Sequence, residues 1–209
     1  MTKTIVFDLD GTLISCRPRQ IAALRAVSRL SSRELSAIWK AKRDGMTTHD
    51  ALLGAGISAI EAEEITRRWL RIIEDPYYLG YDRLLPSAAE ALQICRSIGF
   101  QTVLLTARRS LRGLMLQTNA LRLTSMADQI LLADPRDGPL HKARELRRLS
   151  AVAMIGDSEV DAQAAALAEV SFYAVSSGQR SADFLRSKLG VIPFDAVFPA
   201  TLAALAAVN

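Results

Sequence analysis

The sequence predicts an α/β protein, built on a doubly wound, mostly parallel sheet that carries an inserted, all-helical segment. Two observations lead to this fold class. Short apolar runs alternate with helical patterns over most of the chain, which is typical of a parallel sheet with helical crossovers. One long stretch near the N-terminus breaks this alternation and contains helical patterns alone.

Five short apolar runs are the predicted strands. Each is apolar on both faces and is bounded by turn residues, as buried parallel strands are. The runs cover residues 4–7, 101–105, 129–132, 151–155 and 171–175. Helical patterns follow at 87–98, 110–121, 141–149, 159–168 and 181–189. Because crossovers of this kind are right-handed, the carboxyl ends of all the strands should meet at one edge of the sheet, where ligands bind.

Residues 15–84 look entirely helical. Ser31 and Glu34 have the spacing of a capping box, which predicts a helix from there through about Arg43. A second, longer helix is predicted from Ser58 through Glu74, because a proline follows shortly afterwards. We expect this stretch to form a small helical domain over a core made of residues 1–14 and 85–209. A last strand at 195–198 and a helix are expected to complete the core.

The composition fits a folded protein with a sizeable core, since half of the 209 residues are hydrophobic. The net charge of +4 favours anionic substrates, but the arginines are scattered along helices and no nucleic-acid motif is visible. No apolar run reaches membrane-spanning length, and no signal peptide is recognisable. The two cysteines, Cys16 and Cys95, are far apart in the sequence and predict reduced thiols in a cytoplasmic protein. The sequence does not indicate an oligomeric state.

Polar residues gather at the predicted strand ends. Asp8 and Asp10 follow the first strand, and Thr106 follows the second. Lys142 lies near the start of the helix that precedes the fourth strand, and Asp157 follows that strand within the segment GDSEVD. The predicted topology therefore brings carboxylates, a hydroxyl group and a lysine to one edge of one sheet.

This set resembles the haloacid dehalogenase superfamily of aspartate-dependent phosphatases. The matching features are DxDGT at 8–12, an apolar strand that ends in Thr106, Lys142, and GDSxxD at 156–161. The helical stretch at 15–84 lies where the family inserts its first type of cap. The resemblance implies a Rossmann-like core with a helical type 1 cap.

The resemblance also implies a role for each residue. Asp8 would be the nucleophile that forms an aspartyl-phosphate, and Asp10 the general acid and later the base. Mg²⁺ would be held by Asp8, by the backbone carbonyl of Asp10 and by Asp157. Thr106 and Lys142 would bind the phosphoryl oxygens, and Lys142 would also restrain Asp8.

Four further residues keep two interpretations each. Asp161 either orients Lys142 or a metal-bound water, or stabilises the first turn of a helix. Gly11 either supports the catalytic segment or belongs to a simple turn after the strand. Arg108 stands near a position where many relatives carry asparagine; it either forks onto a second anionic group of the substrate or faces water. Arg19, near the expected junction of cap and core, either meets an anion or lies on the surface.

The function predicted from these residues is that of a magnesium-dependent phosphatase for a small phosphorylated metabolite. Two alternatives remain: a phosphoryl transferase resembling a phosphomutase, and a non-enzymatic phospho-receiver or phosphate-binding module. The sequence does not name the substrate. Specificity is expected in the cap loops at about 43–50 and 76–84.

Overall fold

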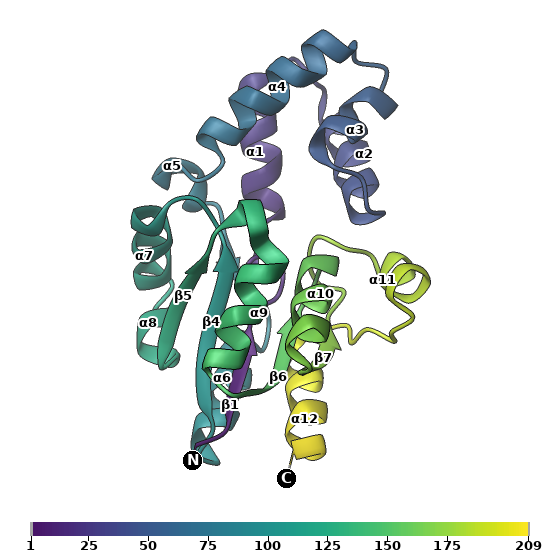
Figure 1. The fold of residues 1–209 in the computed structure, drawn as a ribbon. Coiled ribbons are helices and arrows are strands. Elements are labelled where there is room, and N and C mark those ends of the chain that lie inside the picture. The colour runs from purple at the N-terminus through teal and green to yellow at the C-terminus, as the bar shows by residue number, and fades with distance from the viewer. Residues whose placement is uncertain (1, 209) are drawn as a thin grey trace.

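Five parallel strands form the sheet on which the chain is built (Figure 1). The computed structural model describes residues 2–208, and in it the strand order is β5-β4-β1-β6-β7. All four strand pairs are parallel, so the predicted fold class is confirmed. The strands are β1 (Thr4–Phe7), β4 (Gln101–Ala107), β5 (Gln129–Ala133), β6 (Ala151–Gly156) and β7 (Ser171–Ala174).

The central strand β1 is buried on both faces. Ile5 and Phe7 contribute to one hydrophobic cluster and Val6 to another, because successive side chains of a strand point to opposite faces. The first face is covered by helices α6 (Ala88–Ser97), α7 (Leu111–Ala120), α8 (Leu123–Met126) and α12 (Val197–Val208). The second face is covered by α9 (Gly138–Arg148) and α10 (Glu159–Ala168). The middle residues of the strands are therefore mostly hydrophobic, and most polar residues lie at the strand ends.

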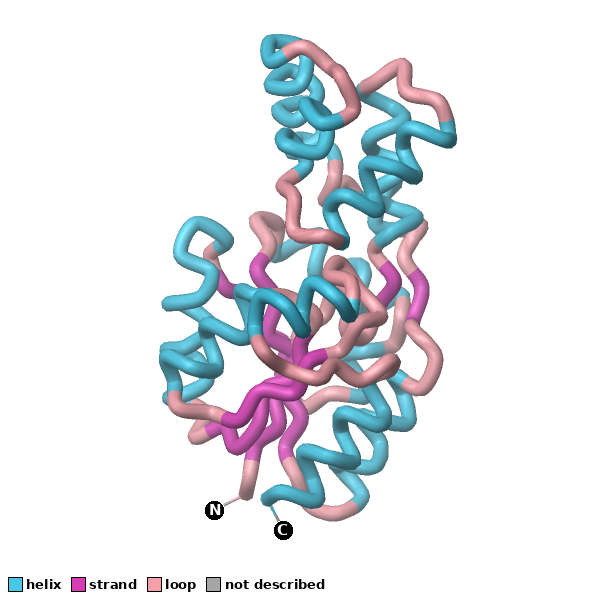
Figure 2. Tube along the Cα trace, turned by 90° about the vertical axis from the view of Figure 1, so that its right-hand side faces the viewer, coloured by secondary structure: helices cyan, strands magenta, loops and turns pink. Residues whose placement is uncertain are grey.

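The segment that breaks the alternation forms five helices above the carboxyl edge of the sheet (Figures 1 and 2). We call them the cap helices: α1 (Arg17–Val27), α2 (Ser32–Arg43), α3 (Thr48–Gly54), α4 (Ala59–Ile72) and α5 (Pro76–Leu79). They enclose a hydrophobic cluster of their own, which includes Leu35, Ile38 and Leu52. This separate cluster supports the predicted division into a core and a helical insertion.

Two short strands tie the cap helices to the core. β2 (Ile14–Ser15) pairs antiparallel with β3 (Arg83–Leu84), so the chain leaves the core and returns to it side by side. The prediction that 15–84 is entirely helical was thus wrong at its ends. Strands of two residues carry too little periodicity to be recognised in a sequence.

Local signals set the helix boundaries. The capping box at the start of α2 is present: the Ser31 hydroxyl accepts from the Glu34 N–H, and the Ser31 N–H donates to the Glu34 carboxylate at 2.7 Å. α4 begins after Ser58 as predicted but ends at Ile72, two residues early. The predicted strand at 195–198 was wrong. α12 begins at Val197. Before it, Phe194 forms only an isolated bridge, with Val175, the residue that follows β7.

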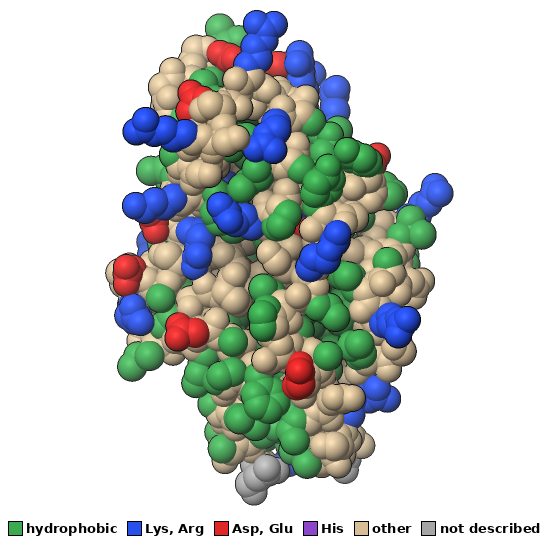
Figure 3. Space-filling view, turned by 180° about the vertical axis from the view of Figure 1, so that it is seen from behind, with side chains coloured by type: hydrophobic (Ala, Val, Ile, Leu, Met, Phe, Trp, Pro, Cys, Tyr) green, Lys and Arg blue, Asp and Glu red, His purple; other side chains and the backbone are tan. Residues whose placement is uncertain are grey.

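The surface agrees with the composition. Lys and Arg side chains are spread over the face in Figure 3 and do not gather into one basic patch. Cys16 and Cys95 are both buried, and neither forms a disulfide. Between residues 2 and 208, no helix combines the length and the apolar character that crossing a membrane requires.

Candidate active site

Asp8 lies where β1 leaves the sheet. Its backbone N–H still donates to the carbonyl of Ile155 in β6, at 2.8 Å, so the backbone is held by the neighbouring strand. Its side chain emerges at the carboxyl edge and is almost fully buried. A buried carboxylate is costly unless another group stabilises its charge, and the surrounding residues supply that group.

Lys142 joins two of the predicted carboxylates. Its Nζ donates to Oδ1 of Asp8 and to Oδ1 of Asp161, at 2.6 Å each. All three side chains are buried, and Lys142 itself is 2 % exposed. Lys142 is therefore not a solvated lysine on a helix face. Ser158 donates to the other oxygen of Asp161 at 2.7 Å, so both oxygens of Asp161 are engaged and its side chain is held against Lys142.

The charges in this group are not balanced by Lys142 alone. Burial raises the pKa of Asp8 to about 7, although Lys142 opposes the shift. Burial, together with the neighbouring Asp8 and Asp161, raises the pKa of Asp157 well above its usual range. Three carboxylates face one ammonium group here, so their full ionisation requires additional positive charge.

A divalent cation fits this requirement. Carboxylate oxygens of Asp8, Asp157 and Asp161 lie within 4.8 Å of one another, and such oxygens are the ligands that Mg²⁺ prefers. Asp161 is occupied by Lys142 and Ser158. Asp8 and Asp157 are therefore the side chains best placed to hold the ion. The role of the Asp10 carbonyl stays a prediction.

Two glycines allow the loops to approach Asp157 closely. Gly11 has φ +97°, and a Cβ there would lie 2.2 Å from the Asp157 carboxylate. A Cβ on Gly178 would lie 2.0 Å from the same carboxylate, which also accepts a hydrogen bond from the Gln179 N–H. Gly11 is thus more than a turn residue, because only glycine fits between its loop and Asp157. Gly178 gave no signal in the sequence.

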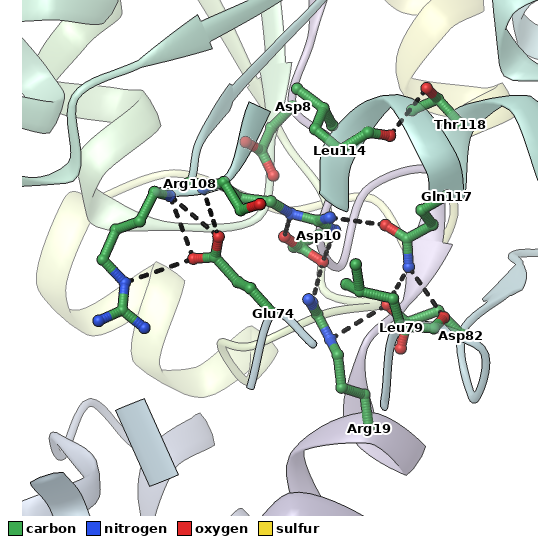
Figure 4. A network of polar contacts seen from close by, with 12 residues as sticks. Asp8, Asp10, Arg19, Glu74, Leu79, Asp82, Arg108, Leu114, Gln117 and Thr118 are labelled. Carbon is green, nitrogen blue, oxygen red and sulfur yellow. Dashed lines mark hydrogen bonds and ion pairs between the residues drawn. The ribbon is translucent and has the colours of Figure 1, made fainter. Parts of the chain in front are cut away.

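Asp10 points toward two arginines (Figure 4). Arg108 donates to both of its oxygens, from Nε to Oδ2 and from Nη2 to Oδ1, at 2.7 Å each. Arg19 donates to Oδ1 as well. Burial acts to raise the pKa of Asp10, but the two guanidinium groups outweigh it and hold that pKa well below its usual range. In this arrangement Asp10 is ionised.

Both arginines are buried, each 3 % exposed. The interpretations that placed Arg108 in water and Arg19 on the surface were wrong. Arg108 is the first residue after β4. Arg19 lies in the first turn of α1, the first of the cap helices. The Arg19–Asp10 contact therefore joins the cap helices to the core.

A second layer of polar groups supports the arginines. Gln117 of α7 accepts from Arg108 Nη1 at 2.6 Å and donates to Asp82 at 2.7 Å. Arg19 Nε lies 3.1 Å from Asp82, and burial raises the pKa of Asp82 to about 6 against the influence of Arg19. These partners could not be found in the sequence, since nothing in their spacing relates them to the strand ends.

A cavity of about 190 Å³ opens between these groups. Its lining includes Asp8, Asp10, Thr106, Lys142, Asp157 and Arg180. The structure thus brings the predicted residues to one cavity, which Asp161, Gly11 and Arg108 adjoin through the contacts described above. Arg180 was not predicted. It pairs with Glu159 at 2.6 Å and donates to the carbonyl of Lys42 in the cap at 2.7 Å.

The sequence matches one family model. The model describes haloacid dehalogenase-like hydrolases, and it covers residues 2–169 of the chain. A search among curated proteins finds no match.

Solved structures share the whole architecture. A predicted phosphatase from Clostridium acetobutylicum superposes with a TM-score of 0.73 at 17% identity, over 99% of each chain. A protein described as a predicted phosphoglycolate phosphatase from Haemophilus somnus gives 0.68 at 18% identity, over 97% of each chain. One provisionally described as a beta-phosphoglucomutase from Thermotoga maritima gives 0.67 at 17% identity, over 100% of each chain. At these identities the likeness establishes the fold alone.

Proposed function

The chain belongs to the haloacid dehalogenase-like hydrolase family, and from its site we propose that it is a magnesium-dependent phosphatase for a small phosphorylated metabolite. The observation that carries this proposal is the buried group of Asp8, Lys142 and Asp157 in one cavity. A nucleophilic carboxylate, a fixed cation and oxygen ligands for a metal are what displacement at a phosphoryl group needs.

In the first step, a carboxylate oxygen of Asp8 bonds to phosphorus while the ester P–O bond breaks. The leaving oxygen takes a proton from Asp10, and the phosphoryl group stays on Asp8 as an aspartyl-phosphate. Lys142 donates hydrogen bonds to Asp8, which aims the nucleophile, and Thr106 lines the same cavity as a donor to the phosphoryl oxygens. Bound Mg²⁺ would neutralise phosphoryl charge, with Asp8, the Asp10 carbonyl and Asp157 as its ligands.

In the second step, the aspartyl-phosphate is hydrolysed. Asp10 is now a carboxylate and takes a proton from water, while the water oxygen bonds to phosphorus and the bond to Asp8 breaks. Inorganic phosphate leaves, and both aspartates return to their starting forms. The two arginines hold Asp10 as a carboxylate in the structure, which is the form that this second step requires of a base. To act as the acid of the first step, Asp10 has to leave the arginines and take up a proton.

The cap helices lie above the carboxyl edge of the sheet, where the cavity is found, and are proposed to exclude water and select the substrate. Arg43 lies in a region where the sequence predicts specificity, and Lys42 directly precedes it. Their carbonyl groups accept hydrogen bonds from Arg180 and Ser181 of the core. This contact supports a cap that reaches the reacting groups.

A phosphoryl transferase is the nearest alternative, since it would use the same residues with a hydroxyl group in place of water. The hydrolase description of the matching family favours water as the acceptor. A non-catalytic phospho-receiver would keep the phosphoryl group on Asp8 without turnover. Release of inorganic phosphate separates both alternatives from the phosphatase.

The test is phosphate release from a panel of phosphorylated metabolites, with Mg²⁺ and with a chelator. We expect turnover that needs Mg²⁺ and falls about a thousandfold or more in Asp8→Asn, which keeps the shape but removes the nucleophile. Asp137→Asn, at an exposed site outside the cavity, is the matched control and should retain activity. Turnover that survives Asp8→Asn would refute the mechanism.

A further inference from the structure

Asp10 is held by more donors than any other carboxylate of the cavity. It accepts three hydrogen bonds, two from Arg108 and one from Arg19, and these engage both of its oxygens. Arg19 and Arg108 are each 3 % exposed, so neither guanidinium group can exchange this carboxylate for bulk water. The three side chains form one largely buried unit (Figure 4), and of the three Asp10 lines the 190 Å³ cavity.

The charges of this unit balance only with Asp10 in place. Arg19 and Arg108 bring two positive charges, and Asp10 and Asp82 bring two carboxylates. Arg19 Nε lies 3.1 Å from one oxygen of Asp82 without forming a well-aligned hydrogen bond, and the other oxygen of Asp82 has no donor. The two guanidinium groups therefore depend on Asp10 and Asp82 for their negative partners.

The contact with the arginines conflicts with the role proposed for Asp10, which is to donate a proton to the leaving oxygen. To reach the leaving oxygen of a substrate, its carboxylate must give up at least one arginine bond. Two buried guanidinium groups would then share too few acceptors, and a buried charge that loses its partner is strongly destabilising. Another anionic group therefore has to bind the two guanidinium groups when the Asp10 carboxylate moves away from them.

We propose that Arg19 and Arg108 bind a second anionic group of the substrate, which takes over the hydrogen bonds that Asp10 accepts in the structure. The inference rests on the proposed phosphatase function and names its substrate class: phosphate monoesters that also carry a carboxylate or a second phosphate. The guanidinium fork of Arg108 already binds one carboxylate through two parallel bonds, which is the geometry that suits either anion.

The position of the unit fits this assignment. Asp10 and Asp8 line the same 190 Å³ cavity, so an anion that replaces the Asp10 carboxylate lies beside the phosphoryl site. Arg108 does not line that cavity but lines a neighbouring one of about 470 Å³ at the same edge of the sheet. A substrate with both anionic groups would span from Asp8 to the arginines and free Asp10 for the leaving oxygen between them. A substrate with one anionic group would leave Asp10 held.

Matched pairs of substrates test the proposal. 2-Phosphoglycolate is compared with ethyl phosphate, which replaces the carboxylate by a methyl group, and 1,3-propanediol bisphosphate with propyl phosphate. We expect kcat/KM to favour the doubly anionic member of at least one pair by about tenfold or more, as charged hydrogen bonds imply. The pair that shows the preference identifies the anion as a carboxylate or a phosphate. Because Asp10 is freed, the preference should appear in kcat as well as in KM.

Substitutions of the two arginines test whether these residues cause the preference for doubly anionic substrates. In Arg108→Gln and Arg19→Gln the preference should fall close to one, while Arg108→Lys, which keeps the charge and loses the fork, should retain part of it. Arg112→Gln, at an exposed position of α7, is the matched control and should keep the full preference. The ratio is measured within each variant, so a smaller folded fraction does not change it. Equal kcat/KM within both pairs, or a preference that survives Arg108→Gln, would overturn the proposal.

A binding measurement separates this proposal from the phosphatase function. If none of these esters nor p-nitrophenyl phosphate is hydrolysed, the proposed function fails. Calorimetric titration of the Asp8→Asn protein with the same four compounds still decides the inference. Tighter binding of the doubly anionic members, lost when Arg108→Gln is added, would support the anion site, and equal binding would refute it.

Discussion

Lys142 is the residue on which the buried acidic group depends. It donates to Asp8 and Asp161 at once, and burial would lower its pKa if these two carboxylates did not raise it above the usual range. The ammonium group is therefore charged at all physiological pH values. It aims Asp8 and offsets one of the three neighbouring negative charges.

Lys142→Met should abolish most of the activity. The substitution removes the donor that fixes Asp8, and losing one preorganised donor costs about a hundredfold or more in kcat. It also leaves two buried carboxylates without their partner, which should lower the free energy of unfolding by about 3 kcal/mol. Steady-state kinetics and urea denaturation measure both effects. Lys188→Met, at an exposed site, is the control; a loss no larger than the control's would show that Lys142 does not position Asp8.

The sequence revealed the residues at the strand ends, and the motifs it shares with the family added Lys142 and Asp161. Asp8, Thr106 and Asp157 were found because strand ends share one edge of a sheet. Arg108 was found, but the direction of its side chain was not, since one residue beyond a strand a side chain can face either water or the cavity. Arg180 comes from a loop whose path only the folded chain defines.

At the scale of elements, the carboxyl end of α2 is joined to the core segment 176–181. Arg43 donates to the carbonyl of Ser176 at 2.7 Å, and the Ser181 N–H donates to the carbonyl of Arg43 at 2.8 Å. Ser181 also donates to the Asp44 carboxylate at 3.0 Å. These bonds hold a cap helix to the segment that carries Arg180 and Gln179 into the site.

Arg43→Gln should loosen this junction without harming the reacting groups. We expect KM to rise severalfold, because the cap spends less time closed, while kcat changes less. Hydrogen exchange should quicken in residues 42–45 and 176–181. Arg33→Gln, at the exposed other end of α2, should leave both measurements unchanged. Unaltered exchange in Arg43→Gln would show that the junction does not hold the cap.

The elements themselves were largely predictable. The five strands of the sheet agree with the apolar runs within two residues, because strands buried on both faces have continuous hydrophobic patterns. The pairing of β2 with β3 was missed, since it depends on two distant residue pairs and on little local pattern. The C-terminal strand was wrong because the helix α12 takes over part of that apolar segment.

At the scale of the whole molecule, the cap carries a buried cation of its own. Lys42 donates to Gln20, and its Nζ lies 4.6 Å from the centre of the Trp69 ring. No carboxylate of residues 2–208 lies within ion-pair distance of it. Burial lowers the pKa of Lys42 to about 7, against 10.5 for an ordinary lysine.

This shift predicts how the stability of the protein depends on pH. Between about pH 7 and pH 10 the unfolded chain binds a proton at Lys42 that the folded chain does not, so the free energy of unfolding rises with pH, by about 1 kcal/mol per unit from this residue. In Lys42→Met that contribution disappears. The difference between the two proteins, measured by urea denaturation at several pH values, isolates it.

Lys40→Met is the matched control, because Lys40 is exposed on the same helix. Its difference from the unsubstituted protein should be independent of pH over this range. A Lys42→Met difference that is equally flat would contradict the assignment of Lys42 as a neutral buried lysine above pH 7.

Capture of the covalent intermediate tests the central claim most directly. The protein is mixed with Mg²⁺ and its best substrate, quenched in acid during turnover, and its peptides are weighed by mass spectrometry. The account predicts one added phosphoryl group on the peptide that contains Asp8, at Asp8 itself, and none in Asp8→Asn. Turnover with no phosphoryl group on Asp8, or with the group on another residue, would contradict it.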